Sequence, residues 1–183
     1  MQKKGRIIKP KFQHGRIVVC ERTFDPMATP TSLTGMALLG IMKRPKDEEE
    51  ENNFIFCEGF HQAMYSRDIF GRIDITNHSQ HAIFNIEVKP HERSKGYGTV
   101  LMNAGADHCR RAGVTTMTGE FGMAGQVDKR ERFYERLDMP VKDLVLPTIS
   151  TNVNNPKLNT IKFEHDKNAT EILNSIPELK RFT

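Results

Sequence analysis

Residues 83–102 read IFNIEVKPHERSKGYGTVLM, a strand-like run, a loop with two glycines and the start of a helix-like run. Gly96 and Gly98 permit backbone conformations that other residues avoid, and they let a ligand approach the main chain closely. The unpaired N–H groups of the helix's first turn would face the loop, together with the positive end of the helix dipole. The stretch therefore predicts an anion site suited to a pyrophosphate, with extra charge from Arg93 and Lys95.

The spacing of the glycines distinguishes this loop from other phosphate-binding loops. A P-loop would need G-x-x-x-x-G-K-[ST] and a dinucleotide fold would need G-x-G-x-x-G, and the sequence has neither pattern. It has Arg93-x-x-Gly96-x-Gly98 instead, directly after a strand-like run that ends in Val88-x-Pro90.

The segments that follow predict a strand–helix–strand unit and a second helix. Thr99–Ala112 is helical in composition, Gly113 is a typical C-terminal stop, and Val114–Phe121 follows as a strand. A helix that connects two strands in this way implies that the strands are parallel and that the connection is right-handed. Asp128–Glu131 has the spacing of a capping box and predicts a helix to about Asp138.

The remaining elements are predicted from short apolar runs. Ile69–Thr76 and Ala82–Val88 are expected to form an antiparallel hairpin across the turn residues Asn77–Gln80. A helix is expected over Gly35–Met42, because its large apolar residues recur at helical spacing. Further strands are expected at Ile17–Cys20, Phe54–Phe60, Leu144–Leu146 and Thr160–Glu164, and a last helix from Ala169.

Length and composition are typical of one domain that has neither a membrane anchor nor a secretion signal. The chain has 183 residues, of which 37% are hydrophobic and 27% are charged. No apolar run approaches the roughly 18 residues of a membrane helix, and Met1–Lys4 is not followed by a signal-peptide core. Three widely spaced cysteines make neither a disulfide framework nor a zinc site, and His78 and His81 lack a third ligand. We therefore expect no membrane partner, no metal, and a reducing compartment such as the cytoplasm.

Charge is unevenly distributed, although the net charge is only +4. Residues 1–19 carry six basic side chains and no acid, whereas Asp47–Glu51 is a run of five acids. A basic arm over residues 1–16 can bind a phosphate backbone or stay solvated. No aromatic platform or nucleic-acid-binding motif accompanies it, which argues against a nucleic-acid partner.

The loop motif over residues 93–98 resembles the [Arg/Gln]-x-x-Gly-x-[Gly/Ala] signature of the GNAT superfamily of acetyl-CoA-dependent N-acetyltransferases. Phe84–Pro90 is similar to the enzymes that acetylate protein N-terminal amines, and Lys95–Asn103 is similar to the histone-acetylating branch. Phe133–Leu137 resembles the family's FYxxLGF helix. The resemblance covers residues 82–140.

This resemblance implies an α+β (α/β mixed) fold with a central, mostly antiparallel sheet, a splayed pair of parallel strands and flanking helices. Together with the chain length, it implies one GNAT-like domain over residues 1–183, with the basic arm over 1–16, a cofactor-binding core over 82–140 and a C-terminal extension over 147–183. Residues 1–50 and 147–183 match no part of the family pattern.

The resemblance also implies how acetyl-CoA would bind. Its pyrophosphate would lie on backbone amides between Ser94 and Thr99, and its pantetheine arm would pair like an extra strand with main-chain groups of Ile86 and Val88. The cofactor-binding residues implied in this way are Ile86, Val88, Arg93, Ser94, Lys95, Gly96, Tyr97, Gly98 and Thr99.

Direct attack of an amine on the thioester requires a neutral amine, hence a base or a water relay, and an acid for the leaving thiolate. Tyr134 matches the family's usual acid position, and its alternative role is that of a helix aromatic that packs against the sheet. Glu120 lies where the N-terminal-acetylating branch often holds a base, and it is otherwise a solvated carboxylate at a strand end. Glu87 is a weaker candidate, because its side chain should face opposite to those of Ile86 and Val88.

Two departures from the family pattern concern catalysis more than fold. The usual LGF after the tyrosine is Leu137-Asp138-Met139 here. The Asn that often contacts pantetheine is missing from its expected place, and Gln126 is a candidate substitute.

Two functions of different classes follow from these expectations. The first is an N-acetyltransferase that transfers an acetyl group from acetyl-CoA to a primary amine of a protein or a small molecule. The second is a GNAT-fold structural or binding protein with weakened or lost catalysis, for example a phage component located in the virion. The sequence leaves open the identity of the acceptor and whether the chain forms a homo-oligomer or a larger assembly.

Overall fold

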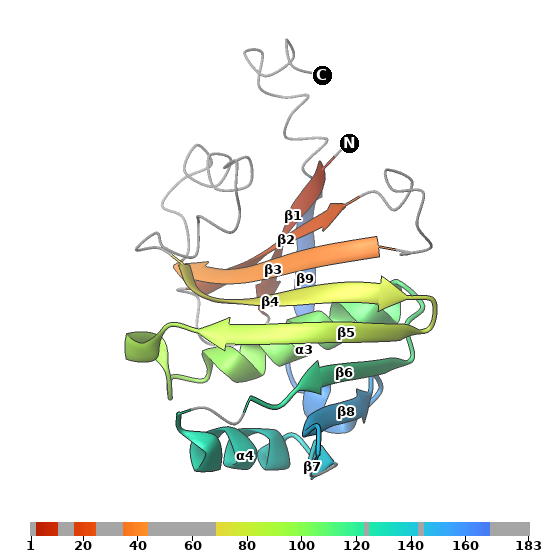
Figure 1. Cartoon of the computed structure of the whole chain (residues 1–183). Coiled ribbons are helices and arrows are strands. Elements are labelled where there is room, and N and C mark those ends of the chain that lie inside the picture. Colours follow the sequence, from red (N-terminus) through yellow and green to blue (C-terminus); the bar gives the residue numbers. More distant parts are fainter. Residues whose placement is uncertain are drawn as a thin grey trace.

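A computed structural model of the chain describes residues 3–10, 17–24, 35–43, 69–122, 125–142 and 145–168. Its nine strands form one sheet in the order β7-β8-β6-β5-β4-β3-β2-β1-β9 (Figure 1). The first five strands are antiparallel neighbours: β1 (Lys3–Pro10), β2 (Ile17–Phe24), β3 (Gly35–Lys43), β4 (Ile69–His78) and β5 (His81–Val88). The other strands are β6 (Thr116–Glu120), β7 (Val141–Lys142), β8 (Thr148–Asn152) and β9 (Phe163–Asn168).

Helix α3 (Tyr97–Arg111) connects β5 to β6, and these two strands pair in parallel (Figure 1). The predicted strand–helix–strand unit is therefore confirmed, as is the mostly antiparallel sheet that contains it. A second helix, α4 (Val127–Arg136), follows β6. Two short 3-10 helices, η2 (Pro90–Glu92) and η3 (Pro156–Leu158), precede α3 and follow β8. In the part of the chain that the structure describes, no helix is long and apolar enough to cross a membrane.

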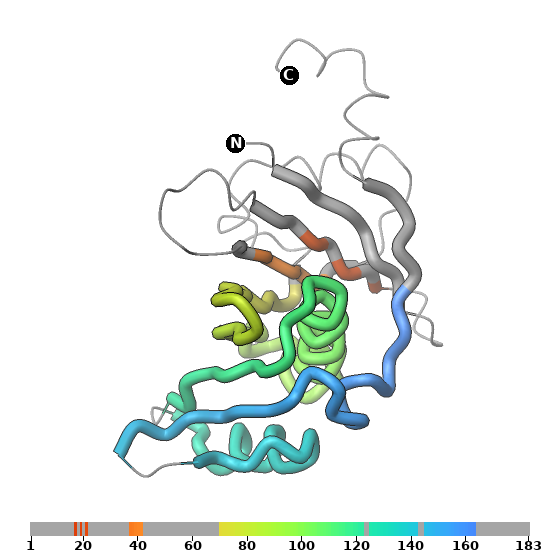
Figure 2. The backbone as a smooth tube through the Cα atoms, turned by 90° about the vertical axis from the view of Figure 1, so that its right-hand side faces the viewer, coloured from red at the N-terminus to blue at the C-terminus, as the bar shows by residue number. Residues whose placement is uncertain are grey.

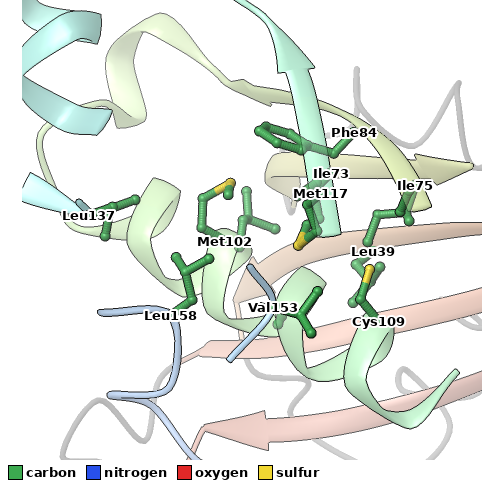
Figure 3. Close-up of a cluster of buried hydrophobic side chains, with 14 of the residues drawn as sticks. Leu39, Ile73, Ile75, Phe84, Met102, Cys109, Met117, Leu137, Val153 and Leu158 are labelled. Atoms are coloured by element: carbon green, nitrogen blue, oxygen red, sulfur yellow. The ribbon is translucent and has the colours of Figure 1, made fainter. Parts of the chain in front are cut away.

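The core lies between α3 and one face of the sheet (Figure 3). Figure 3 shows Met102 and Cys109 of α3 close to apolar side chains from the sheet, among them Leu39, Ile73 and Ile75. All five of these side chains are fully buried. Burial also raises the pKa of the Cys109 thiol to about 12, so Cys109 is a packed core residue, as predicted.

The helix predicted over Gly35–Met42 is wrong, because this segment forms β3. Leu38 and Leu39 point to opposite faces of the strand, and both are buried. A strand that is buried on both faces has a continuous apolar run instead of an alternating pattern, and periodicity cannot distinguish such a run from a buried helix.

Four smaller predictions also need correction. Val145 and Leu146 do not form a strand but lie in an exposed bend between β7 and β8. The capping box is absent, because α4 begins at Val127 and Asp128 lies inside the helix. The strand expected from Thr160 begins later, at Phe163, and part of the basic N-terminal segment forms β1. The predicted elements at 54–60 and from 169 lie outside the described residues.

Helices α3 and α4 each end in a Schellman motif, in which a residue beyond the helix bonds back to the last turn. The N–H of Val114 donates to the Cys109 carbonyl at 2.9 Å after α3, and the N–H of Met139 donates to the Tyr134 carbonyl at 2.9 Å after α4. The motif requires a left-handed residue, which is Gly113 with φ +80° in the first case and Asp138 with φ +53° in the second. Asp138, which stands in place of the glycine of LGF, therefore fits this turn.

The segment between β8 and β9 runs alongside α3 toward the opposite end of the sheet (Figure 2). Two side chains of α3 hold it there. The buried Asn103 accepts hydrogen bonds from the N–H groups of Thr160 and Ile161 at 3.0 and 3.1 Å, and Arg110 donates to the Val153 carbonyl at 2.7 Å.

A buried polar cluster ties the C-terminal end of α3 to β2. Glu21 of β2 is only 1% exposed, and its carboxylate accepts a hydrogen bond from Nδ1 of His108. Arg111 approaches the same carboxylate at 3.2 Å. A carboxylate taken out of water is stable only while such partners remain.

We predict that Glu21→Ala lowers the free energy of unfolding by about 3–5 kcal/mol, because it leaves His108 and Arg111 facing an empty buried site. Urea unfolding monitored by circular dichroism measures this change. Lys95→Ala is the control, since it removes an exposed ion pair with Glu92 and should leave the unfolding midpoint nearly unchanged. Equal midpoints for the two variants would contradict a stabilising role of the cluster.

Candidate functional site

The parallel pair of strands stops pairing before β5 ends. Its register runs from His81–Thr116 to Phe84–Gly119, whereas β5 continues to Val88. Gly119 makes this last pairing sterically feasible, because a Cβ atom there would lie 2.7 Å from the Phe84 ring. Beyond this pair, no described strand bonds to β5 on the β6 side.

The direction of the main-chain groups along this open edge follows from the hairpin with β4. The N–H of Lys89 donates to the Phe70 carbonyl of β4 at 2.9 Å. Because successive residues of an antiparallel ladder point their main-chain groups to alternate sides, those of Ile86 and Val88 point away from β4. Ile86 and Val88, the two residues predicted to pair with pantetheine, therefore lie on the open edge of β5.

The loop after β5 leads into an uncapped helix N-terminus. Ser94 and Gly96 both adopt left-handed conformations, with φ of +63° and +84°. The N–H of Val100, which donates to the Gly96 carbonyl at 3.2 Å, starts the hydrogen bonding of α3. No side chain caps the helix, so the amides of the preceding turn are available to an anion.

The two basic side chains of the loop are occupied by contacts within the chain. Nε of Arg93 donates to the Val88 carbonyl at 3.0 Å, which ties the loop to the end of β5. Nζ of Lys95 donates to Glu92 at 2.8 Å, and this bond raises the pKa of the lysine. The side chains of Arg93 and Lys95 are both exposed. Ser94, which lies between them, and Gly96, which follows Lys95, are exposed too.

The start of α3 packs tightly between β4 and α4. The ring of Tyr97 stacks on that of Phe70, with centroids 5.0 Å apart. A Cβ atom at Gly98 would lie 3.1 Å from the ring of Phe133. The lack of a side chain at Gly98 thus allows α4 to approach α3 closely. Because Tyr134 directly follows Phe133, this contact also determines how far Tyr134 lies from the loop.

Tyr134 lies against the end of β6. It is 6% exposed, and its ring contacts that of Phe121, which directly follows β6, with centroids 6.2 Å apart. Burial raises the pKa of Tyr134 to about 12, and the positive charge of Arg130 acts in the opposite direction. At neutral pH the hydroxyl is therefore protonated.

The other candidates lie at the surface. Glu120 is the last residue of β6 and is exposed, opposite Thr148 of β8. Gln126 is exposed at the N-cap of α4. Glu87 is exposed as its place on β5 predicts, and it lies 3.7 Å from Arg72.

Phe121 and Arg130 were not predicted to belong to the site, although both lie beside Tyr134. The available signal for Arg130 was its spacing, since residues i and i+4 share one side of a helix. Phe121 carried no such signal, because its contact with Tyr134 joins two elements separated by a loop.

The geometry fits an extended ligand that carries a phosphate group at one end. The open edge of β5 offers main-chain partners to its extended part, and the uncapped turn of α3 offers amides to its phosphates. At Gly96 nothing lies within 4 Å of where a Cβ would be, so the loop is open to a ligand. Within the described ranges, no group of three or more His, Cys, Asp or Glu side chains could hold a metal ion.

A protein-family model matches the segment that contains the candidate site. The family model described as "Acetyltransferase (GNAT) family" matches residues 36–139. No curated protein matches the chain significantly.

Solved structures that resemble the chain share little sequence with it. They include a GNAT-family protein from Desulfovibrio desulfuricans (14% identity, 63% of this chain and 69% of that chain, TM-score 0.44). Ard1 from Thermoplasma volcanium is similar over 62% of this chain and 69% of that chain, with 15% identity and a TM-score of 0.43. The protein yncA from Salmonella typhimurium, solved with its cofactor acetyl-CoA, is 14% identical over 65% of each chain, slightly less than two thirds, with a TM-score of 0.46.

The family model covers more than half of the chain and includes the parallel strands, the loop, α3 and α4. The chain therefore belongs to the GNAT family of acetyltransferases, whose members use acetyl-CoA.

Proposed function

We propose that this protein transfers the acetyl group of acetyl-CoA to a primary amine by direct attack of the amine on the thioester. The observation that carries the proposal is the open edge of β5 at Ile86 and Val88, which leads directly into the uncapped first turn of α3. In one continuous stretch of chain, an extended thioester arm and a pyrophosphate would each find main-chain partners.

The proposed binding mode relies on the backbone more than on charged side chains. The pyrophosphate would bind the amides between Ser94 and Thr99, and the pantetheine arm would pair with the main-chain groups of Ile86 and Val88. Arg93 contributes by tying the loop to the Val88 carbonyl, so that the two binding surfaces keep a constant separation. Lys95, which is already paired with Glu92, adds positive charge at the rim.

The proposed reaction moves one proton from the amine to the leaving sulfur. The amine nitrogen forms the new bond to the carbonyl carbon, the carbon–sulfur bond breaks, and the products are an N-acetylated amine and free coenzyme A. Glu120, directly or through water, would accept the amine proton, and Tyr134 would supply a proton to the thiolate. Most of the rate enhancement would come from holding the reactants in position.

Calorimetry with acetyl-CoA and an assay of thiol release test the proposal together. The amine panel should contain peptides with a free N-terminus, lysine peptides, polyamines and amine-bearing antibiotics. Binding together with acetylation of at least one class supports the proposal, and the absence of acetyl-CoA binding overturns it. Binding without turnover on every amine would instead favour a structural or assembly protein, such as a virion component.

We predict that Gly96→Asp abolishes acetyl-CoA binding, because it places a carboxylate beside the amides proposed to bind the pyrophosphate. Gly113→Asp is a matched control at the other end of α3. Gly113 has nearly the same backbone conformation, and a Cβ there would meet nothing within 4 Å either.

Asp138 shows that an aspartate is accommodated at such a conformation in this chain. Calorimetry should therefore detect binding to Gly113→Asp and none to Gly96→Asp, with both variants folded by circular dichroism. Equal affinities of the two variants would refute the assignment of the pyrophosphate site.

We predict that Tyr134→Phe lowers kcat by about 100-fold or more while acetyl-CoA affinity is nearly unchanged. The hydroxyl acts only as the thiolate departs, so its loss raises the energy of the transition state and not that of the ground state. The phenylalanine ring can still pack against Phe121. Steady-state kinetics and calorimetry measure the two quantities, and an unchanged kcat would leave Tyr134 only its packing role.

A further inference from the structure

We propose that the Arg130 guanidinium, held over the Phe121 ring one helical turn before Tyr134, is a positioning residue that stabilises developing negative charge on the Tyr134 oxygen. The inference rests on the proposed function, because it concerns the group that would protonate the leaving thiolate.

The placement of Arg130 follows from contacts on both sides of Phe121. The guanidinium carbon of Arg130 lies 5.8 Å from the centre of the Phe121 ring, an arrangement in which the ring attracts the cation. The same ring meets Tyr134 edge-on, with centroids 6.2 Å apart and planes inclined by 66°. Because Arg130 and Tyr134 are four residues apart on α4, their side chains share one side of the helix. Phe121 thus holds the cation next to the tyrosine.

Arg130 differs from every other charged residue of α4. The other six charged side chains of the helix are exposed to solvent, as are those of Glu120 and Lys142 on the neighbouring strands. Arg130 is half-buried, and its Nε atom is out of contact with water. Charges removed from water are screened less, so the field of Arg130 at Tyr134 is stronger than that of the exposed groups.

The chemical consequence concerns the difference in pKa between the proton donor, Tyr134, and the proton acceptor, the leaving thiolate. Burial raises the pKa of Tyr134 to about 12, whereas an ordinary thiol has a pKa of about 8.5. A donor whose pKa is far above that of the acceptor transfers its proton less readily. The positive charge of Arg130 stabilises the phenolate form, lowers the pKa of Tyr134 and reduces this mismatch.

Titration of Tyr134 tests the inference without any need for enzymatic activity. The chain has three tyrosines, so Tyr65→Phe and Tyr97→Phe leave Tyr134 as the single reporter. Replacing it by difluorotyrosine brings its ionisation to a pH at which the fold persists. Arg130→Met should raise the midpoint of phenolate absorbance by roughly one pH unit, and Arg130→Lys should restore part of the shift.

Arg132→Met is the matched control, because it removes an exposed arginine from the same helix and should leave the midpoint in place. An unchanged midpoint in folded Arg130→Met overturns the inference. Should that variant not fold, Arg130→Gln decides by the same measurement.

A double-mutant cycle on the acetyl-transfer reaction gives a second readout. Arg130→Met should lower kcat about tenfold in the wild-type chain and change it little in Tyr134→Phe, because Arg130 acts through the hydroxyl. An equal loss in both backgrounds overturns the inference. If no amine is acetylated at all, the proposed function fails while the titration still decides the role of Arg130.

Discussion

The contact between the Phe84 ring and Gly119 sets the geometry on which the candidate site depends. Parallel strands pair until one of them ends, and here β6 ends at Glu120, one residue after this contact, while β5 runs four residues past it. Gly119 provides the space in which the ring lies, so the strands stay in register up to this point. Beyond it, the main-chain groups of Ile86 and Val88 point to a side where no described strand pairs with them, and the Val88 carbonyl accepts a hydrogen bond from the Arg93 side chain. A free strand edge of this kind is a template for an extended ligand.

Contacts with other parts of the chain hold helix α3 in place along its whole length. Its first turn packs against Phe133 of α4, the buried Asn103 in its middle bonds to the segment that precedes β9, and His108 near its end bonds to Glu21 of β2. These partners are distant from one another in sequence. The uncapped first turn of α3 is therefore placed by the core, and Tyr134 is placed relative to it by the contact between Gly98 and Phe133.

Much of the site was predictable because its signals are local. The left-handed Gly96, the helix behind it and the strand in front of it lie within about thirty residues, and each follows from composition and turn chemistry. The side of β5 on which Ile86 and Val88 lie follows from the alternation of a strand. Burial of Tyr134 and the position of Arg130 were not predictable in this way, since they depend on Phe121, which reaches α4 only after the chain has folded.

The same distinction applies to the fold. Periodicity and stop signals were sufficient for the hairpin, for α3 with its glycine stop, and for the parallel arrangement of β5 and β6, because each depends on neighbouring residues. They were misleading for residues 35–43, where burial on both faces removes the alternation that identifies a strand. Periodicity and stop signals also did not predict the position of β9 beside β1, the burial of Glu21 or the point at which the parallel strands stop pairing. Those features arise from contacts between segments that are far apart in the chain. A local pattern of residues does not predict the energies of such contacts.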